Sequence, residues 1–106
     1  MRSLRTTKTF EKDFKRVAKQ GREMSRLKTV IEQLVADQTL SPLRRDHALI
    51  GSYNDSRECH IQSDWLLIYH VTQTELTLVR TGSHSDLFFI ARKHAPAFRR
   101  RSRITS

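Results

Sequence analysis

The stretch CHIQSDWLLIYHV (residues 59–71) contains the most apolar element of this 106-residue chain and decides how the chain can fold. Its second half, WLLIYHV, shows no alternation of apolar and polar side chains, which predicts a central strand covered on both faces. Three residues at the entrance of this strand differ in kind: His60, Asp64 and Trp65. We therefore expect titratable and aromatic groups at the mouth of a buried strand.

Extended runs on either side of this element predict a small sheet. The runs at about 53–62, 65–72 and 75–81 are separated by the polar segments QSD and TQT, which are typical of tight turns. Three such runs in succession predict an antiparallel meander whose middle strand is the apolar one.

The first third of the chain has helical periodicity. SLRTT could form a short strand, and Thr6 or Thr7 could cap a helix whose apolar residues are Phe10, Phe14 and Val17. Gly21 can adopt positive φ at the end of this helix, and a second helix is predicted from about 24 to 37. We expect an α+β fold in which the two-helix hairpin packs on the sheet.

The remaining segments are polar or basic. SPLRRDHALIGSYNDSR (residues 41–57) is predicted to be mostly loop, and SHSDLFFIARKHAPAF (residues 83–98) predicts a short helix capped by Ser83 or Ser85. We expect one domain over residues 1–90 and a flexible basic extension over residues 91–106.

The net charge, the single cysteine and the N-terminal residues indicate which kind of partner and which cell compartment to expect. A net charge of +9 and a pI near 10.6 favour a polyanionic partner, which could be RNA, DNA or an acidic protein. The single cysteine, Cys59, excludes an internal disulfide and a cysteine-rich metal site, and is expected to be a buried strand residue. The N-terminus has charges where a signal peptide needs an apolar run, so we expect a soluble cytoplasmic protein.

Histidines and one carboxylate are predicted to meet at one end of the meander. His47 lies in the preceding loop, His60 ends one run, Asp64 begins the next, and His84 follows the third. Such a cluster suits RNA cleavage without a metal, because one imidazole can take the proton of the ribose 2′-hydroxyl and another can protonate the leaving oxygen. His70 and His94 are expected to be structural or surface residues.

Aromatic and basic residues near this cluster could bind RNA. Trp65 and Phe88 could stack on bases, although core packing is the commoner role for an aromatic residue at either position. The candidates for phosphate contacts are Arg44, Arg45, Arg57 and Arg80.

Three motifs together resemble a known family. DHALIGSY (residues 46–53), RECHIQSDWLLIYHV (residues 57–71) and RTGSHSDLF (residues 80–88) are similar in order and spacing to the YafQ branch of the RelE-like toxins of bacterial type II toxin–antitoxin systems. The resemblance implies a ribosome-dependent mRNA endonuclease that needs no cofactor and binds an acidic antitoxin. It also implies two helices packed on an antiparallel sheet.

The family's functional positions fall on residues of this chain. The resemblance assigns catalytic roles to His47, His60, Asp64 and His84, and aromatic roles to Trp65 and Phe88. Two departures are visible. The chain continues past the last motif to Ser106, and Ala48 stands where the family often has proline.

Two alternatives lead to different chemistry. A toxin of the ParE branch would have a similar fold and inhibit DNA gyrase by binding, but that branch lacks the histidine set. Alternatively, the three histidines and Asp64 could form a zinc site, although their spacing matches no compact metal motif.

Overall fold

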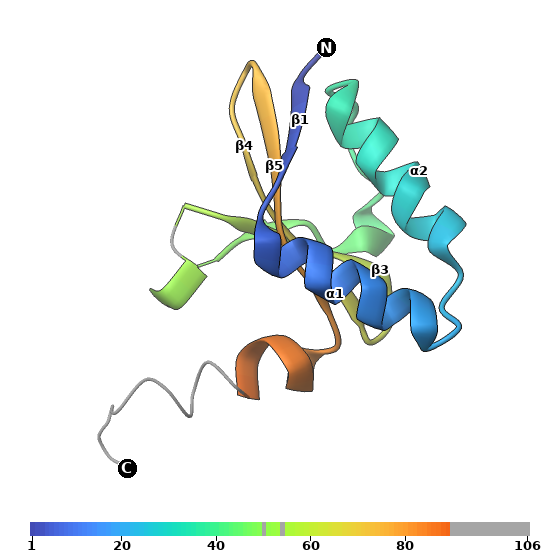
Figure 1. Cartoon of the computed structure of the whole chain (residues 1–106). Helices are drawn as coiled ribbons and strands as arrows, with labels where there is room; N and C mark the ends of the chain where they lie inside the picture. Colours follow the sequence, from blue (N-terminus) through green and yellow to red (C-terminus); the bar gives the residue numbers. More distant parts are fainter. Residues whose placement is uncertain (50, 54, 90–106) are drawn as a thin grey trace.

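The chain folds as one sheet with two helices against it (Figure 1). A computed structural model describes residues 1–49, 51–53 and 55–89. The strands are β1 (Ser3–Thr6), β2 (His47–Ala48), β3 (Arg57–Gln62), β4 (Trp65–Val71) and β5 (Glu75–Gly82). The helices are α1 (Lys8–Lys19) and α2 (Met24–Val35), with short turns η1 (Pro42–Arg44), η2 (Gly51–Tyr53) and η3 (Ser85–Phe89). The predicted α+β class is confirmed.

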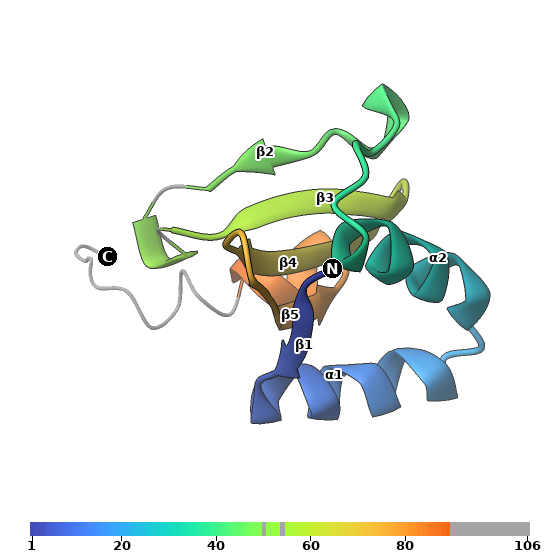
Figure 2. The same ribbon diagram turned by 90° about the horizontal axis from the view of Figure 1, so that it is seen from above.

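The predicted meander forms the middle of the sheet. The strand order is β1-β5-β4-β3-β2, and β3, β4 and β5 pair antiparallel in sequence (Figure 2). The first run begins at Arg57 rather than near residue 53, because Gly51 at φ 80° starts the turn η2 there. The two-residue strand β2 was not expected, since so short a segment has no periodicity to detect.

The sheet is mixed, whereas the family resemblance implied an antiparallel one. β1 pairs parallel with β5, from Ser3 opposite Glu75 to Thr6 opposite Leu78. The chain leaves β1 directly into α1, with Thr7 as the predicted cap, and its side-chain oxygen accepts the N–H of Phe10 at 2.9 Å. This short connection places α1 across one face of the sheet.

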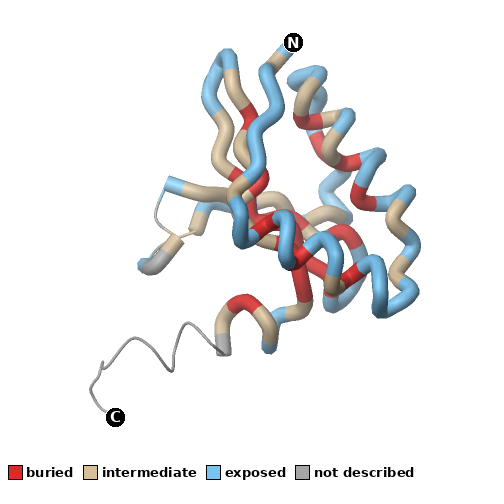
Figure 3. The backbone as a smooth tube through the Cα atoms, viewed as in Figure 1, coloured by how far each residue is buried: buried red, intermediate tan, exposed pale blue. Residues whose placement is uncertain are grey.

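β4 is buried on both faces, as its sequence predicts (Figure 3). On one face, Trp65, Leu67 and Tyr69 pack with the apolar sides of α1 and α2. On the other face, Leu66 and Ile68 pack with Leu87 of η3 and with partly buried neighbours. Each face therefore needs its own cover, the helices on one side and the segment after β5 on the other.

Two residues that the sequence predicted to lie in the core differ in their burial. Cys59 is buried in β3, and burial raises the pKa of its thiol to about 12, so it is an unreactive core residue. Phe14 is 42% exposed, although it belongs to the apolar stripe of α1. Gly21 takes φ 78° between the helices, as predicted.

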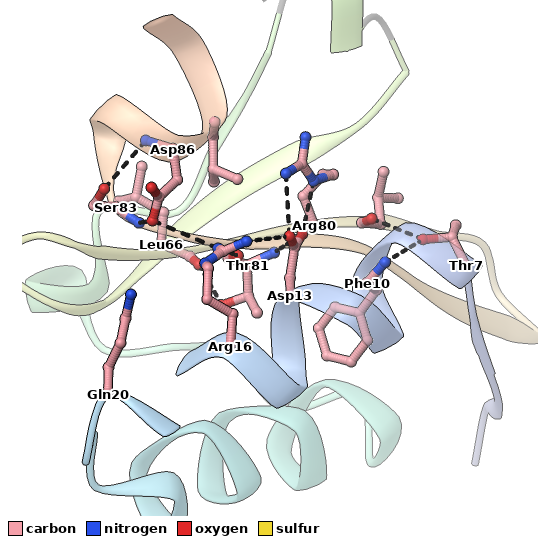
Figure 4. A network of polar contacts seen from close by, with 12 residues as sticks. Thr7, Phe10, Asp13, Arg16, Gln20, Leu66, Arg80, Thr81, Ser83 and Asp86 are labelled. Carbon is pink, nitrogen blue, oxygen red and sulfur yellow. Dashed lines mark hydrogen bonds and ion pairs between the residues drawn. The ribbon is translucent and has the colours of Figure 1, made fainter. Parts of the chain in front are cut away.

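A buried carboxylate joins α1 to β5 (Figure 4). Asp13 is 2% exposed and accepts hydrogen bonds from Arg80 at 2.6 and 3.1 Å, from Arg16 at 2.7 Å and from the Thr81 N–H at 3.2 Å. Burial alone raises the pKa of Asp13, but these hydrogen bonds outweigh burial and the pKa is lowered. The ionised carboxylate is therefore part of the folded structure.

The last turn is stabilised by a reciprocal cap. Ser83 N–H donates to Asp86 at 3.2 Å, and Asp86 N–H donates to the Ser83 hydroxyl at 3.1 Å, which selects Ser83 of the two predicted caps. The basic extension, residues 91–106, and His94 lie outside the described residues. Among the described residues, no helix is long and apolar enough to cross a membrane.

We predict that Asp13→Ala lowers the free energy of unfolding by about 3 to 5 kcal/mol, because the substitution leaves two guanidinium groups without their acceptor. Chemical denaturation followed by circular dichroism measures this loss. Asp37→Asn is the control, because it removes the charge that pairs Asp37 with Arg2 and keeps a residue type that tolerates the φ of 60° at this position. Asp37 is largely exposed, so this change should cost at most about 1 kcal/mol.

The Asp13 contribution also has a defined pH dependence. Its folded pKa lies below the ordinary value of 3.8, so its stabilisation is complete above that value and is lost as the pH falls through the folded pKa. Wild-type stability should therefore fall more steeply below about pH 4 than that of Asp13→Ala. Equal slopes would contradict the assignment.

Candidate active site

The predicted catalytic residues gather at one end of the sheet because of the strand register. His60 lies opposite Leu66 across β3 and β4, and Leu66 lies opposite Gly82 across β4 and β5. The turn that carries Asp64 and the segment that carries His84 therefore extend past the same end of the sheet. The entrance of the buried strand is the site that the sequence indicated.

Asp64 and His84 form a direct pair. The Asp64 Oδ1 atom is 2.9 Å from the Nδ1 atom of His84 and also accepts the main-chain N–H of His84 at 3.1 Å. The side-chain hydrogen bond from His84, with a smaller contribution from the main-chain bond, lowers the pKa of Asp64. Both side chains are exposed, so the pair is accessible to a large substrate.

His60 and Phe88, which are both partly buried, complete the cluster around His84. The ring centroids of His60 and His84 are 5.8 Å apart, and those of His84 and Phe88 are 6.3 Å apart. Phe88 also packs edge to face on Tyr53 at 5.9 Å, and it remains partly exposed. Its proposed contact with a base stays a prediction.

A carboxylate that sequence reasoning missed lies beside the histidines. Glu58 is only 5% exposed, and its Oε1 atom is 3.3 Å from the Nε2 atom of His47 and 4.0 Å from that of His60. His47 reaches it because β2 pairs with β3 so that His47 lies opposite Glu58. The period of two along a strand places residues 58 and 60 on one face and could have indicated Glu58.

The structure leaves Trp65 no exposed surface on which a base could stack. Trp65 is 0% exposed, its indole N–H donates to the Thr81 hydroxyl at 3.0 Å, and the guanidinium of Arg22 lies 5.4 Å from its ring centre. The alternative of core packing is the one observed. A strand that is buried on both faces leaves its first aromatic residue no route to a base.

The four predicted phosphate-binding arginines differ in their surroundings. Arg80 is held by Asp13, and Arg57 pairs with Asp46 at 3.1 Å. Arg44 donates to the main-chain oxygen of Ile61 at 2.8 Å, whereas Arg45 is exposed. The phosphate role of Arg80 is not supported, because its guanidinium is committed to an internal ion pair.

The cluster also offers a set of metal ligands. Ligand atoms of Glu58, His60 and His84 lie within 4.8 Å of one another. Imidazole and carboxylate are ordinary ligands for zinc and for copper. The zinc alternative from the sequence used Asp64 as the carboxylate ligand, whereas the structure groups Glu58 with these two histidines.

Comparisons with known proteins show the family to which the chain belongs. The family described as "Bacterial toxin of type II toxin-antitoxin system, YafQ" matches residues 2–89. The mRNA interferase toxin YafQ of Escherichia coli K12 is 36% identical over 80 residues, which cover 74% of this chain and 87% of that protein.

Solved structures have the same fold. The toxin chain of the E. coli DinJ–YafQ toxin–antitoxin complex matches with a TM-score of 0.77 and 34% identity, covering 82% of this chain and 97% of that one. A metal-bound toxin from Helicobacter pylori matches with a TM-score of 0.77 and 42% identity, covering 83% of this chain and all of that one.

We predict that His84→Ala raises the pKa of Asp64 part of the way to its ordinary value, because the side-chain hydrogen bond is lost while the main-chain one remains. Titration of the Asp64 carboxyl carbon by NMR measures the change. His70→Ala, which removes a histidine from the other end of β4, should leave the Asp64 pKa unchanged. An unaltered Asp64 pKa in His84→Ala would show that the pair does not form in solution.

Proposed function

The chain belongs to the YafQ family of type II toxin–antitoxin toxins, and from this membership we propose that it is an mRNA endonuclease that cleaves translated mRNA and arrests growth. The observation that carries the proposal is the Asp64–His84 pair with the His60 ring beside it. The gyrase-binding alternative gains no support, because that activity needs none of these groups.

We assign the proton transfers from the hydrogen bonds. An ionised carboxylate only accepts hydrogen bonds, so the Nδ1 atom of His84 carries a hydrogen toward Asp64 and the Nε2 atom is left for proton transfer. We propose that His84 protonates the departing 5′-oxygen and that Asp64 orients it. His60 is then the base that takes the proton of the 2′-hydroxyl.

Glu58 supports the other side of the site. Its buried carboxylate lies between the Nε2 atoms of His47 and His60, so it can orient both rings and stabilise positive charge on either one. We propose that Glu58 is a positioning residue and that His47 contacts the phosphate. None of these steps requires a metal, and a metal bound by Glu58, His60 and His84 would block the proton transfers.

The proposed substrate and cell compartment rest on the net charge of the chain and on its family. The ribosome and its mRNA are polyanions, and a chain of net charge +9 gains Coulomb energy and counterion release on binding them. We propose that the protein acts in the cytoplasm, on mRNA held in the ribosome.

His84→Ala should abolish growth arrest and lower mRNA cleavage by about 10² to 10⁴, equivalent to about 3 to 5.5 kcal/mol of barrier, because a general acid is removed. Expression in bacteria followed by mapping of mRNA 5′ ends measures cleavage. Stability should hardly change, since the side chain is exposed.

The matched control for this experiment is His70→Ala. The Nδ1 atom of His70 lies 2.6 Å from the main-chain oxygen of Asp55, away from the cluster, so the variant should still cut mRNA. A folded His84→Ala protein that cuts at the wild-type rate would remove His84 from the mechanism. Intact mRNA together with gyrase-linked DNA damage by the wild type would support the ParE-like alternative.

We further propose where the antitoxin binds. An apolar groove of about 390 Å³ lies between α1 and α2, lined by Phe14, Met24, Leu27 and Ile31. Half-exposed Phe14 is a large aromatic side chain beside it, and basic residues outnumber acidic ones on both helices. An amphipathic helix with acidic flanks fits this groove in both apolar surface and charge.

Phe14→Glu should weaken antitoxin binding by about 30-fold or more, because it removes an aromatic anchor of about 2 kcal/mol and adds a charge in an apolar groove. Calorimetry with the neutralising antitoxin measures the affinity. Leu4→Glu, the same kind of change at an exposed position on β1, is the matched control. Unchanged affinity in folded Phe14→Glu would place the antitoxin elsewhere.

A further inference from the structure

A cavity beside the proposed catalytic cluster is lined by residues that, apart from His60, take no part in the proposed proton transfers. It measures about 600 Å³ and is bounded by α2, by the loop that contains η1 and by the turn between β3 and β4. His60 is one of its lining residues, so the cavity borders the proposed cleavage site at the imidazole that we propose as the base.

The cavity is lined by positive charge. Arg26, Arg44 and Arg45 border it together with His60, and no carboxylate is among its lining residues. Within the described part of the chain, neither Arg44 nor Arg45 has an ion-pair partner, while Arg26 pairs only with exposed Glu23. Guanidinium groups gathered without acids repel one another, and an anion such as a phosphate relieves this repulsion.

The backbone holds these arginines in place. Arg44 donates to the main-chain oxygens of Ile61 at 2.8 Å and His60 at 3.4 Å, which fixes the loop against the end of β3. Arg45 has a left-handed conformation at φ 52°, which is strained for a non-glycine residue. Its carbonyl lies 2.6 Å from the His47 Nδ1 atom, so the strained residue links the cavity to the catalytic cluster.

The other walls suit a base. Leu43 is 88% exposed at the cavity, with Pro42 and Ile61 as further apolar surface. Gln62 and Ser63 add an amide and a hydroxyl that can distinguish the hydrogen-bonding edges of bases. A cavity of this size lies in the range of small-ligand sites and admits one unpaired nucleotide rather than a duplex.

We propose that this cavity binds the mRNA nucleotide next to the scissile phosphate and sets the sequence preference of cleavage. The arginines bind its phosphate, and Gln62 with Ser63 contacts its base. This inference rests on the proposed function and adds to it a specificity site that shares only His60 with the proton-transfer groups.

The first test measures binding without cleavage. The probes are four 2′-O-methyl trinucleotides that differ in one base, which lack the attacking 2′-hydroxyl. Titrated into the wild-type protein, they should shift the NMR amide signals of Leu43, Gln62 and Ser63, and one base should bind more tightly than the others. Shifts confined to other surfaces, or equal affinity for all four probes, would overturn the proposal.

The second test measures cleavage on ribosomes programmed with a defined mRNA. Arg45→Ala should raise KM by about 10-fold or more with a smaller change in kcat, while Gln62→Ala combined with Ser63→Ala should redistribute the cut sites. Arg5→Ala is the matched control, because it removes an exposed arginine at the opposite edge of the sheet and should change neither.

The outcomes separate this inference from the proposed function. If the wild type cuts mRNA but the cavity variants keep its KM and its cut sites, the nucleotide site is refuted and the endonuclease stands. If the wild type does not cut mRNA at all, the endonuclease itself is refuted.

Discussion

The ionised carboxylate of Asp13 is the interaction on which the geometry of this molecule depends. It accepts four hydrogen bonds from two arginines and one main-chain N–H, and it ties α1 to the last residues of β5. Immediately beyond this contact the chain passes through Gly82, where a Cβ atom would lie 2.5 Å from the Arg16 guanidinium, and then reaches His84. The helix layer and the proposed catalytic cluster therefore share one buried support.

Most of the fold could be predicted from the sequence, because its signals are local. The unbroken apolar run of β4, the turns on either side of it, the Thr7 cap and the helical stripes each depend on a few neighbouring residues. The parallel pairing of β1 with β5 could not be predicted in this way, because it joins segments about seventy residues apart. The strand β2 was missed because two residues show no period.

The site was predicted less completely than the fold. His60, Asp64 and His84 meet because up-and-down connectivity brings the ends of neighbouring strands together, which a sequence can indicate. Glu58 was missed because the period of two along a strand indicates only that it shares a face with His60, whereas its burial beside the histidines is not visible in the sequence. For Trp65 the sequence offered two roles, because a tryptophan can either stack on a base or pack in a core. Its position on a strand buried on both faces decides for the core.

The order of the elements along the chain has a consequence for synthesis. The helical hairpin precedes β3, β4 and β5 in the chain. The edge strand β1 cannot pair until β5, its partner in the sheet, has been synthesised. A growing chain thus presents the apolar sides of α1 and α2 before it has a sheet to cover them. Asp64 precedes β4 and His84 follows β5, so the Asp64–His84 pair, which we propose to be catalytic, cannot form in a nascent chain until both strands have been made.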